Sequence, residues 1–219
     1  MIDFNRMVDK HIEREHRPKQ AGRYFPSEIG NCIRKLFYSY KYPQKVDKEL
    51  LKIFEVGNML HGFIVEVLKD AKNSEVELLK SEMPFMIEKE DFVISGRVDY
   101  LILVKESGKS VLVEAKSTAK LEYVKKASSS HIAQLMFYMS ATGVHNGVIL
   151  YIDKNNLKSK VFEIPFDEHK AAEINDKFSF LHSSLKEDSL PEAEAKKIKD
   201  MNWICRFCEY RDKCDRNEK

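Results

Sequence analysis

The side chains best suited to chemistry lie in two neighbouring apolar runs of the sequence, 98–104 and 111–115. The first run contains Asp99, and the second contains Glu114 and is followed at once by Lys116. A short polar segment separates the runs, which is the pattern typical of a β-hairpin. Two carboxylates and one ammonium group therefore fall on strands that we expect to be adjacent.

The predicted turn of this hairpin brings the three side chains together. If Ser107-Gly108 is a two-residue turn, Asp99 lies opposite Lys116 in the antiparallel pair. Side chains alternate along a strand, so Glu114 and Lys116 share one face, and opposed residues share it too. We therefore expect all three groups to converge on one patch of the sheet.

Such a patch could bind a divalent cation. A pair of carboxylates is a hard-oxygen site suited to Mg²⁺ or Mn²⁺, and a nearby lysine can orient water for attack on phosphorus. The competing interpretation is that these are ordinary charges on a solvated face, since Glu-x-Lys is common on antiparallel strands. Gly96, three residues before the aspartate, argues against this alternative, because glycine inside a strand often marks a bulge or a close backbone approach.

The cysteines form a second candidate site. Cys205 and Cys208 make a Cys-x-x-Cys chelating pair, Cys214 follows, and Cys32 far upstream is the only other cysteine. Four thiolates could hold a tetrahedral Zn²⁺ or a [4Fe–4S] cluster. Because zinc sites more often use two such pairs, the single pair favours a cluster, although zinc and unligated thiols remain alternatives. Either metal centre would join the C-terminal segment to the N-terminal one.

Two predicted helices carry polar residues that could complete the carboxylate site. A long amphipathic helix over Asp47–Lys72 carries His61, although a lone helical histidine is more often a structural or surface group. A second helix over 128–142 carries Gln134 and Tyr138, four residues apart and therefore on one face.

The remaining pattern predicts an alternation of strands and helices. Helices are expected at 28–40 and Asp167–Lys186, and strands at 75–88, 92–104, 110–116, 146–152 and 159–164. The first 17 residues predict a short basic helical arm that includes Lys10, Arg14 and Arg17, with a solvated surface helix as the competing interpretation. We expect an N-terminal arm over 1–22, a core over 23–189 and a cysteine-rich C-terminal segment over 190–219.

Composition limits the class of protein. A chain of 219 residues with 43% hydrophobic residues can bury a proper core. A third of the residues are charged but the net charge is only +2, which excludes a simple polybasic nucleic-acid binder and requires any DNA-binding surface to be local. The sequence has no signal-like start and no apolar run long enough to span a membrane, so we expect a cytoplasmic protein with no membrane contact. In that compartment, cysteines are expected to bind a metal or a cluster and not to form disulfides.

Taken in order, these motifs resemble the CRISPR-associated iron–sulfur exonucleases of the fourth Cas family, which are RecB-like PD-(D/E)xK nucleases. The matching residues are Ser27, Cys32, Arg34, Tyr38, Gly57, His61, Gly96 to Asp99, Glu114 to Lys116, Gln134, Tyr138, Cys205 to Cys208 and Cys214. The ordered set is specific although each motif alone is weak. The resemblance implies an α/β nuclease core with a mixed central sheet flanked by helices, plus an iron–sulfur-bearing N/C-terminal subdomain.

The resemblance also implies roles for individual residues. One cation, Mn²⁺ or Mg²⁺, would be held by His61, Asp99, Glu114 and the backbone carbonyl of Ala115. Catalysis would rest on Asp99, Glu114 and Lys116, with the lysine helping to activate the attacking water. The [4Fe–4S] cluster would be held by Cys32, Cys205, Cys208 and Cys214. DNA contacts are expected from Arg34, Lys35, Gln134 and Tyr138, with support of the site as the alternative role for Gln134 and Tyr138.

The implied activity is metal-dependent exonucleolytic hydrolysis of single-stranded DNA or DNA overhangs. By analogy with the family, it would trim DNA fragments for CRISPR spacer acquisition, with the CRISPR integrase complex as a partner. Further candidates for local positive charge are Lys120, Lys125 and Lys126, for each of which solvated surface lysine is the competing interpretation. The alternatives are a non-cutting DNA-binding module that assists an integrase, and a RecB-like nuclease of recombination or repair.

Overall fold

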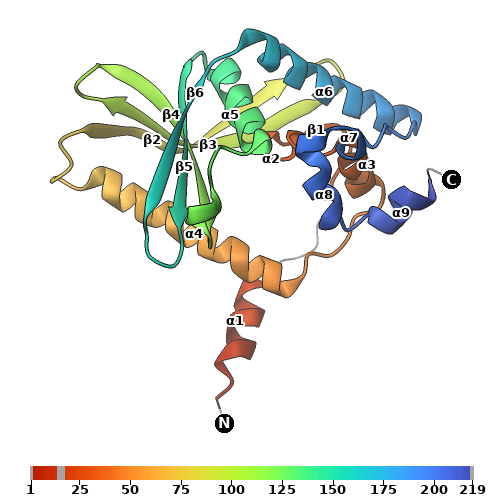
Figure 1. Cartoon of the computed structure of the whole chain (residues 1–219), viewed down its shortest axis with the longest axis horizontal. Coiled ribbons are helices and arrows are strands. Elements are labelled where there is room, and N and C mark those ends of the chain that lie inside the picture. Colours follow the sequence, from red (N-terminus) through yellow and green to blue (C-terminus); the bar gives the residue numbers. More distant parts are fainter. Residues whose placement is uncertain (1, 14–17, 218–219) are drawn as a thin grey trace.

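The computed structural model describes residues 2–13 and 18–217, and it contains one mixed β-sheet flanked by helices (Figure 1). The strands are β1 (Arg23–Tyr24), β2 (Val76–Glu88), β3 (Val93–Val104), β4 (Lys109–Thr118), β5 (Asn146–Asp153) and β6 (Ser159–Pro165). The helices are α1 (Phe4–Ile12), α2 (Pro26–Ile29), α3 (Ile33–Lys41), α4 (Lys48–Lys69), α5 (Ser129–Thr142), α6 (Glu168–Glu187), α7 (Glu194–Lys197), α8 (Asn202–Arg206) and α9 (Arg211–Arg216), with short 3₁₀ turns η1 (Leu121–Tyr123) and η2 (Lys199–Met201). The predicted fold class, an α/β fold with a mixed sheet, is confirmed.

The sheet has the strand order β1-β3-β4-β5-β6, with β2 also paired to β3. The β1–β3 and β4–β5 pairs are parallel, and the other pairs are antiparallel. The parallel β4–β5 connection carries α5 across one face of the sheet, as a crossover between parallel neighbours requires. Strands β3 and β4, which carry the predicted carboxylates, therefore lie inside the sheet.

The β3–β4 hairpin differs from the predicted one by its turn. Val104 pairs with Lys109 and Tyr100 with Val113, so the loop has four residues and Ser107-Gly108 is not a two-residue turn. The predicted pairing of Asp99 with Lys116 is therefore wrong by two positions. Shifting one strand by two residues leaves every side chain on the same face, because the side-chain period is two. The prediction that Asp99, Glu114 and Lys116 converge therefore does not depend on this error.

Strand β3 changes its facing at Asp99. Val98 packs in the core cluster that contains α5, whereas Tyr100, two residues on, packs in the cluster beneath α4. On the neighbouring strand β2, Glu82 has a φ of 50°, in the left-handed region that residues other than glycine rarely adopt. Ser81 pairs with Tyr100 and Met83 with Val98 in one register, which places Glu82 opposite Asp99. The regular alternation of the sheet thus breaks at the level of the carboxylates.

Helices cover both faces of the sheet. Helices α3, α5 and α6 contribute to the larger core cluster on one side, and α4 contributes Ile64 to the smaller cluster on the other. The predicted helix at 28–40 is split into α2 and α3. The break includes Gly30, where a Cβ would collide with Ser130 of α5, so close packing of α2 on α5 interrupts the helix.

The N-terminal and C-terminal segments meet beside α3. A small apolar cluster joins Cys32 to Ala195, Met201 and Ile204, and the Ile33 N–H donates to a Glu194 carboxylate oxygen at 2.8 Å. Figure 1 shows α7, α8 and α9 gathered at this end of the molecule. The domain boundaries expected from the sequence remain a prediction.

Helix α1 extends from the body and contacts α4 near its start (Figure 1). Its Asp9 forms an ion pair with Lys52 at 2.8 Å, and Ile12 is buried. Arg14 and Arg17 of the predicted arm lie outside the described residues. Within the described part of the chain, none of the helices combines the length and apolarity needed to cross a bilayer.

Candidate active site

Asp99 lies in the sheet at the point where β3 changes its facing. Its Oδ2 accepts a hydrogen bond from the Ala115 N–H at 2.8 Å, and its Oδ1 lies 3.7 Å from Nδ1 of His61. Burial raises the pKa of this carboxyl, while His61 and the Ala115 N–H oppose the shift. Strand β4 and helix α4 thus both hold the Asp99 carboxylate in position.

Glu114 is the most deeply buried charge of the site. Its side chain is 1% exposed, and Oε1 lies 2.7 Å from Nζ of Lys116. The second oxygen, Oε2, is buried and has no hydrogen-bond partner. Burial, followed by repulsion from Asp99, raises the pKa of Glu114 to about 8. A buried carboxylate oxygen without a partner is costly and is therefore available to a cation.

Lys116 connects the carboxylates to α5. Besides Glu114, its ammonium group donates to Oε1 of Gln134 at 3.0 Å. The Gln134 amide in turn donates to the Tyr138 hydroxyl at 3.0 Å, and both side chains are buried. The structure therefore brings Gln134 and Tyr138 into the site, as a support that fixes the lysine.

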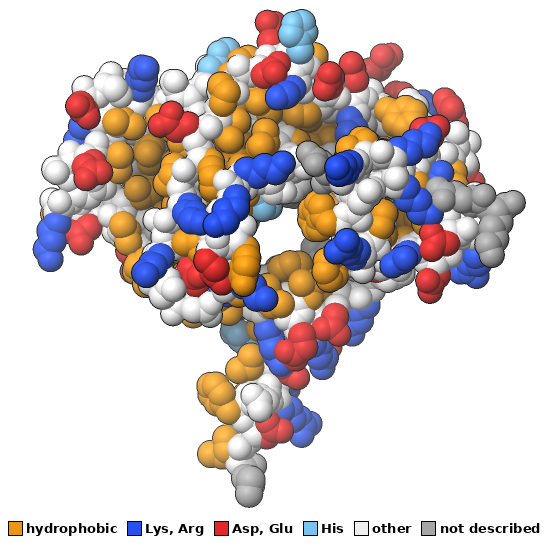
Figure 2. All heavy atoms as spheres, in the orientation of Figure 1, with side chains coloured by type: hydrophobic (Ala, Val, Ile, Leu, Met, Phe, Trp, Pro, Cys, Tyr) orange, Lys and Arg blue, Asp and Glu red, His pale blue; other side chains and the backbone are white. Residues whose placement is uncertain are grey.

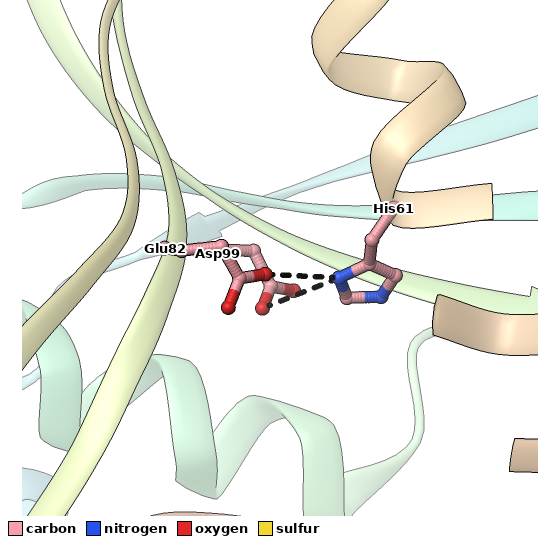
Figure 3. A group of neighbouring side chains, drawn as sticks. All are labelled: His61, Glu82 and Asp99. Carbon is pink, nitrogen blue, oxygen red and sulfur yellow. Dashed lines mark ion pairs between the residues drawn. The ribbon is translucent and has the colours of Figure 1, made fainter. Parts of the chain in front are cut away.

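His61 and Glu82 complete the open side of the site. Figure 3 shows the two side chains converging with Asp99 from α4, β2 and β3. Ligand atoms of these three residues lie within 4.8 Å of one another, and His61 Nδ1 is 3.8 Å from Glu82 Oε1. The other Glu82 oxygen pairs with Arg97 at 2.8 Å. Sequence reasoning missed Glu82.

The donor set fits a divalent cation. It offers carboxylate oxygens and one imidazole, the ligands that suit Mn²⁺ and Mg²⁺, and it includes the unpartnered Oε2 of Glu114. A cavity of about 810 Å³ opens over His61, Glu82 and Asp99 and gives access from solvent. Ala115 lies between Glu114 and Lys116 with its N–H bound to Asp99; the ligand role of its carbonyl remains a prediction.

The four cysteines line a separate cavity of about 310 Å³ at the chain ends. Mutual repulsion among Cys32, Cys205 and Cys214 contributes to a raised pKa of Cys205, after the larger effect of burial. Burial likewise raises the pKa of Cys208. The sequence-predicted ligands thus lie around one space.

Two predicted DNA contacts lie at this cysteine cavity and not at the carboxylates. Arg34 Nε donates to the Pro191 carbonyl at 2.6 Å, and its Nη1 lies 3.7 Å from the Cys214 sulfur. Lys35 forms an ion pair with Glu209 at 2.9 Å. Both side chains are therefore engaged within the protein, and their DNA-binding role remains a prediction.

Comparisons with known proteins agree with this geometry. A family model described as the PD-(D/E)XK nuclease superfamily matches residues 14–215. The chain is 21% identical over 191 residues to the CRISPR-associated exonuclease Cas4 of Saccharolobus solfataricus, a match that covers 87% of this chain and 86% of that protein.

Solved structures with a similar fold include SSO0001, with a TM-score of 0.56 and 18% identity over 94% of this chain and 90% of that one. The alkaline exonuclease LHK-Exo from Laribacter hongkongensis is also similar, with a TM-score of 0.52 and 14% identity over 77% of this chain and 90% of that one. At these identities the likeness concerns the fold alone.

Proposed function

The chain belongs to the PD-(D/E)XK nuclease superfamily, and on this basis we propose that it is a metal-dependent exonuclease that degrades single-stranded DNA or DNA overhangs. The observation that carries the proposal is the buried Glu114 beside Asp99, with one oxygen unpartnered and Lys116 bound to the other. Such a group has no evident structural purpose, because a buried carboxylate oxygen without a hydrogen-bond partner weakens a fold. The relative named as a CRISPR-associated exonuclease supports the same activity class.

In the proposed reaction, one Mn²⁺ or Mg²⁺ would be held by His61, Asp99, Glu114 and the carbonyl of Ala115, and when bound it would supply Lewis-acid chemistry at the scissile phosphate. Glu82, whose carboxylate lies 3.8 Å from His61, is an additional ligand candidate. Lys116 is held by Glu114 and Gln134, so its ammonium group orients the attacking water and stabilises negative charge on the phosphate. Tyr138 fixes Gln134 and thereby the lysine.

A [4Fe–4S] cluster held by the four cysteines is also part of the proposal. The cysteines surround one cavity of about 310 Å³. The single Cys-x-x-Cys pair, Cys205 and Cys208, together with two isolated cysteines favours a cluster, with a tetrahedral Zn²⁺ as the alternative.

The proposed biological role is the trimming of DNA for CRISPR spacer acquisition, together with an integrase complex. It rests on the similarity to a curated relative named as a CRISPR-associated exonuclease, which extends over most of both chains. The alternative roles, in recombination or repair, use the same chemistry. This role is tested by co-purification with the integrase from the native host. The Lys116→Ala protein should still co-purify with the integrase, and an unrelated nuclease should not.

The activity is tested with end-labelled single-stranded DNA and Mn²⁺. Wild type should shorten the strand, whereas Lys116→Ala should lose about a thousandfold or more in rate, because one preorganised charged group commonly contributes this much. Lys170→Ala is the matched control and should retain full activity. Lys170 is an exposed residue of α6 whose ammonium group pairs with the nearby Asp167. Tight DNA binding without any shortening by wild type would instead identify a non-cutting module.

A further inference from the structure

Glu82 of β2 connects the candidate cation ligands to an arginine. One oxygen of its carboxylate lies 3.8 Å from Nδ1 of His61, and the other forms an ion pair with Nη1 of Arg97 at 2.8 Å. Figure 3 shows the Glu82 and Asp99 carboxylates side by side and facing the His61 ring. The same carboxylate thus lies between the space for a cation and a guanidinium group.

The backbone of Glu82 is strained. Three of the described residues other than glycine have a positive φ, and Glu82, at 50°, is the one that lies inside a strand. This region is costly for a residue with a side chain, and such strain persists where the surrounding structure holds it, often at a functional site. Its neighbours Ser81 and Met83 remain in register with β3. The strain is therefore confined to the residue that reaches the site.

Arg97 of β3 is a cation that is open to solvent. Its side chain is 67% exposed, and it lines the active-site cavity together with His61, Glu82 and Asp99. A guanidinium group can bind a phosphate through two parallel hydrogen bonds, whereas an ion pair between exposed side chains contributes little. A phosphate that enters the cavity therefore competes well with Glu82 for this arginine.

The charge of the whole molecule does little to attract a phosphate. The net charge is only +2, and Figure 2 shows Lys and Arg side chains lying among Asp and Glu side chains over the face that it displays. Since a mixed surface exerts little net attraction on a polyanion, we expect phosphate contacts from individual cations at the site. Lys116 is already held by Glu114 and Gln134, whereas Arg97 is accessible.

We propose that Arg97 is a substrate-binding residue and that Glu82 releases it when a phosphodiester of the DNA enters the cavity. In the free protein, Glu82 neutralises Arg97. With substrate bound, the guanidinium group binds the phosphodiester, and the Glu82 carboxylate is free to bind the cation beside His61. Each ligand removes the group that competes with the other, so the cation and the phosphodiester strengthen each other's binding. The proposal rests on the proposed function and adds to it the residue that recognises the phosphodiester.

The first measurement is the affinity for Mn²⁺ with and without a phosphodiester analogue that cannot be cut. In this thymidine dinucleotide, CH₂ groups replace both bridging oxygens of the phosphate, so the negative charge remains and neither bond can be hydrolysed. Electron paramagnetic resonance of free Mn²⁺ measures binding to the full-length protein. We expect the charged dinucleotide to tighten Mn²⁺ binding to wild type at least about tenfold. The uncharged methylphosphonate dinucleotide should leave the affinity for Mn²⁺ unchanged.

Two substitutions should each produce a gain as well as a loss. Arg97→Ala should tighten Mn²⁺ binding about threefold in the absence of dinucleotide, because Glu82 no longer pairs with a cation. It should also reduce the effect of the charged dinucleotide to at most about threefold. Glu82→Gln should weaken Mn²⁺ binding about tenfold but tighten metal-free binding of the charged dinucleotide about threefold, because Arg97 has lost its carboxylate partner. A purely structural role for the ion pair predicts no gain in either protein.

Two further variants serve as controls. Arg97→Lys keeps the charge without the paired hydrogen bonds, so it should restore part of the effect of the charged dinucleotide on Mn²⁺ binding. Lys186 forms an exposed ion pair of equal length, 2.8 Å, with Asp91 outside the cavity. Lys186→Ala should therefore bind Mn²⁺ and the dinucleotide as wild type does.

The outcomes separate this proposal from the proposed function. Unchanged or weaker Mn²⁺ binding by Arg97→Ala would overturn the exchange, as would the lack of any gain in metal-free dinucleotide binding by Glu82→Gln. Neither result would affect the conclusion of the cutting assay. An equal effect of the charged dinucleotide in wild type and Arg97→Ala would overturn the role of Arg97. The full expected pattern in a protein that cuts no DNA would uphold the exchange and reject the nuclease function.

Discussion

At the scale of single residues, Glu114 couples the stability of the protein to cation binding. Its carboxylate is buried beside Asp99 with Oε2 unpaired. We expect Glu114→Gln to raise the free energy of unfolding of the metal-free protein by about 1–3 kcal/mol, because the substitution removes a buried repulsion. It should also abolish the increase in melting temperature caused by Mn²⁺.

Thermal melts with and without Mn²⁺ measure both effects. In wild type, free Mn²⁺ at about a hundred times its Kd should stabilise the fold by about 2.7 kcal/mol, or about 5–10 °C for a chain of this size. Glu163→Gln, on an exposed position of β6, is the matched control. An equal Mn²⁺ response in wild type and Glu114→Gln would mean that the cation does not bind this carboxylate.

The buried His131 makes the stability of the protein depend on pH. Burial, with a smaller contribution from Lys116, lowers the pKa of this histidine to about 4, and its Nδ1 lies 2.7 Å from the Tyr151 hydroxyl. Its ordinary pKa of about 6.5 applies in the unfolded chain. The folded state therefore binds fewer protons between these values, so stability is complete above pH 6.5 and is lost as the pH falls towards 4.

The measurement is urea unfolding at pH 6.5 and pH 5. Between these values His131 should cost wild type about 2 kcal/mol, and His131→Gln should lack this part of the acid destabilisation. The remaining pH dependence, from other groups, should be common to both proteins. Equal losses in the two proteins would show that His131 does not carry the effect.

Some of the site could be predicted from residues alone and some could not. Asp99 and Glu114 were identifiable because each lies within an apolar run of a strand, where a charge is unusual. Glu82 was not identifiable, because β2 contains other acidic residues, such as Glu77 and Glu88, with the same local surroundings. Only the pairing of β2 with β3, including the left-handed φ of Glu82, brings that carboxylate to the site.

At the scale of elements, periodicity predicted the strands and longer helices well, whereas the exact pairing escaped it. The hairpin register was wrong by two positions, because alternation determines which face a side chain occupies but not how far one strand slides along another. The break between α2 and α3 escaped prediction for a related reason. It depends on contact with α5 at Gly30, and this contact is not visible within the helix's own sequence.

Gly96 tests how closely side chains of α2 and β2 pack against strand β3 beside the site. A Cβ at this position would lie 2.9 Å from the Phe85 ring and 3.2 Å from Pro26. Because Phe85 already packs edge-on against Tyr138, the ring cannot move away freely. We expect Gly96→Ala to lower the free energy of unfolding by about 1–3 kcal/mol, measured by chemical denaturation.

Gly62 of α4 is the matched control for this substitution. A Cβ there meets nothing within 4 Å, so Gly62→Ala should raise the free energy of unfolding by about 0.5–1 kcal/mol through higher helix propensity. Opposite signs for the two alanines are the expected result. Stabilisation of both proteins would mean that β3 has room beside Phe85 and that Gly96 serves another purpose.

At the scale of the whole molecule, the two ends of the chain close one side of the structure. The cysteine content of the sequence predicted that Cys32 meets the C-terminal cysteines, and all four line one cavity. That Tyr123 of η1 and Trp203 of α8 line one cavity was not predictable, because nothing in either local sequence indicates that these elements meet. That arrangement depends on how the C-terminal helices are held against α3.

Cys32→Ala therefore tests the connection between the ends of the chain. If the four cysteines hold a [4Fe–4S] cluster, wild type should contain about four iron atoms per chain and the variant should lose them. Loss of a cross-link that closes such a long loop should cost about 4 kcal/mol, or about 8–15 °C in melting temperature, and should expose the C-terminal helices to protease. Phe207→Ala, 79% exposed and beside Cys208, should retain iron and stability. Unchanged iron content and melting temperature would reject a cluster that organises this end of the molecule.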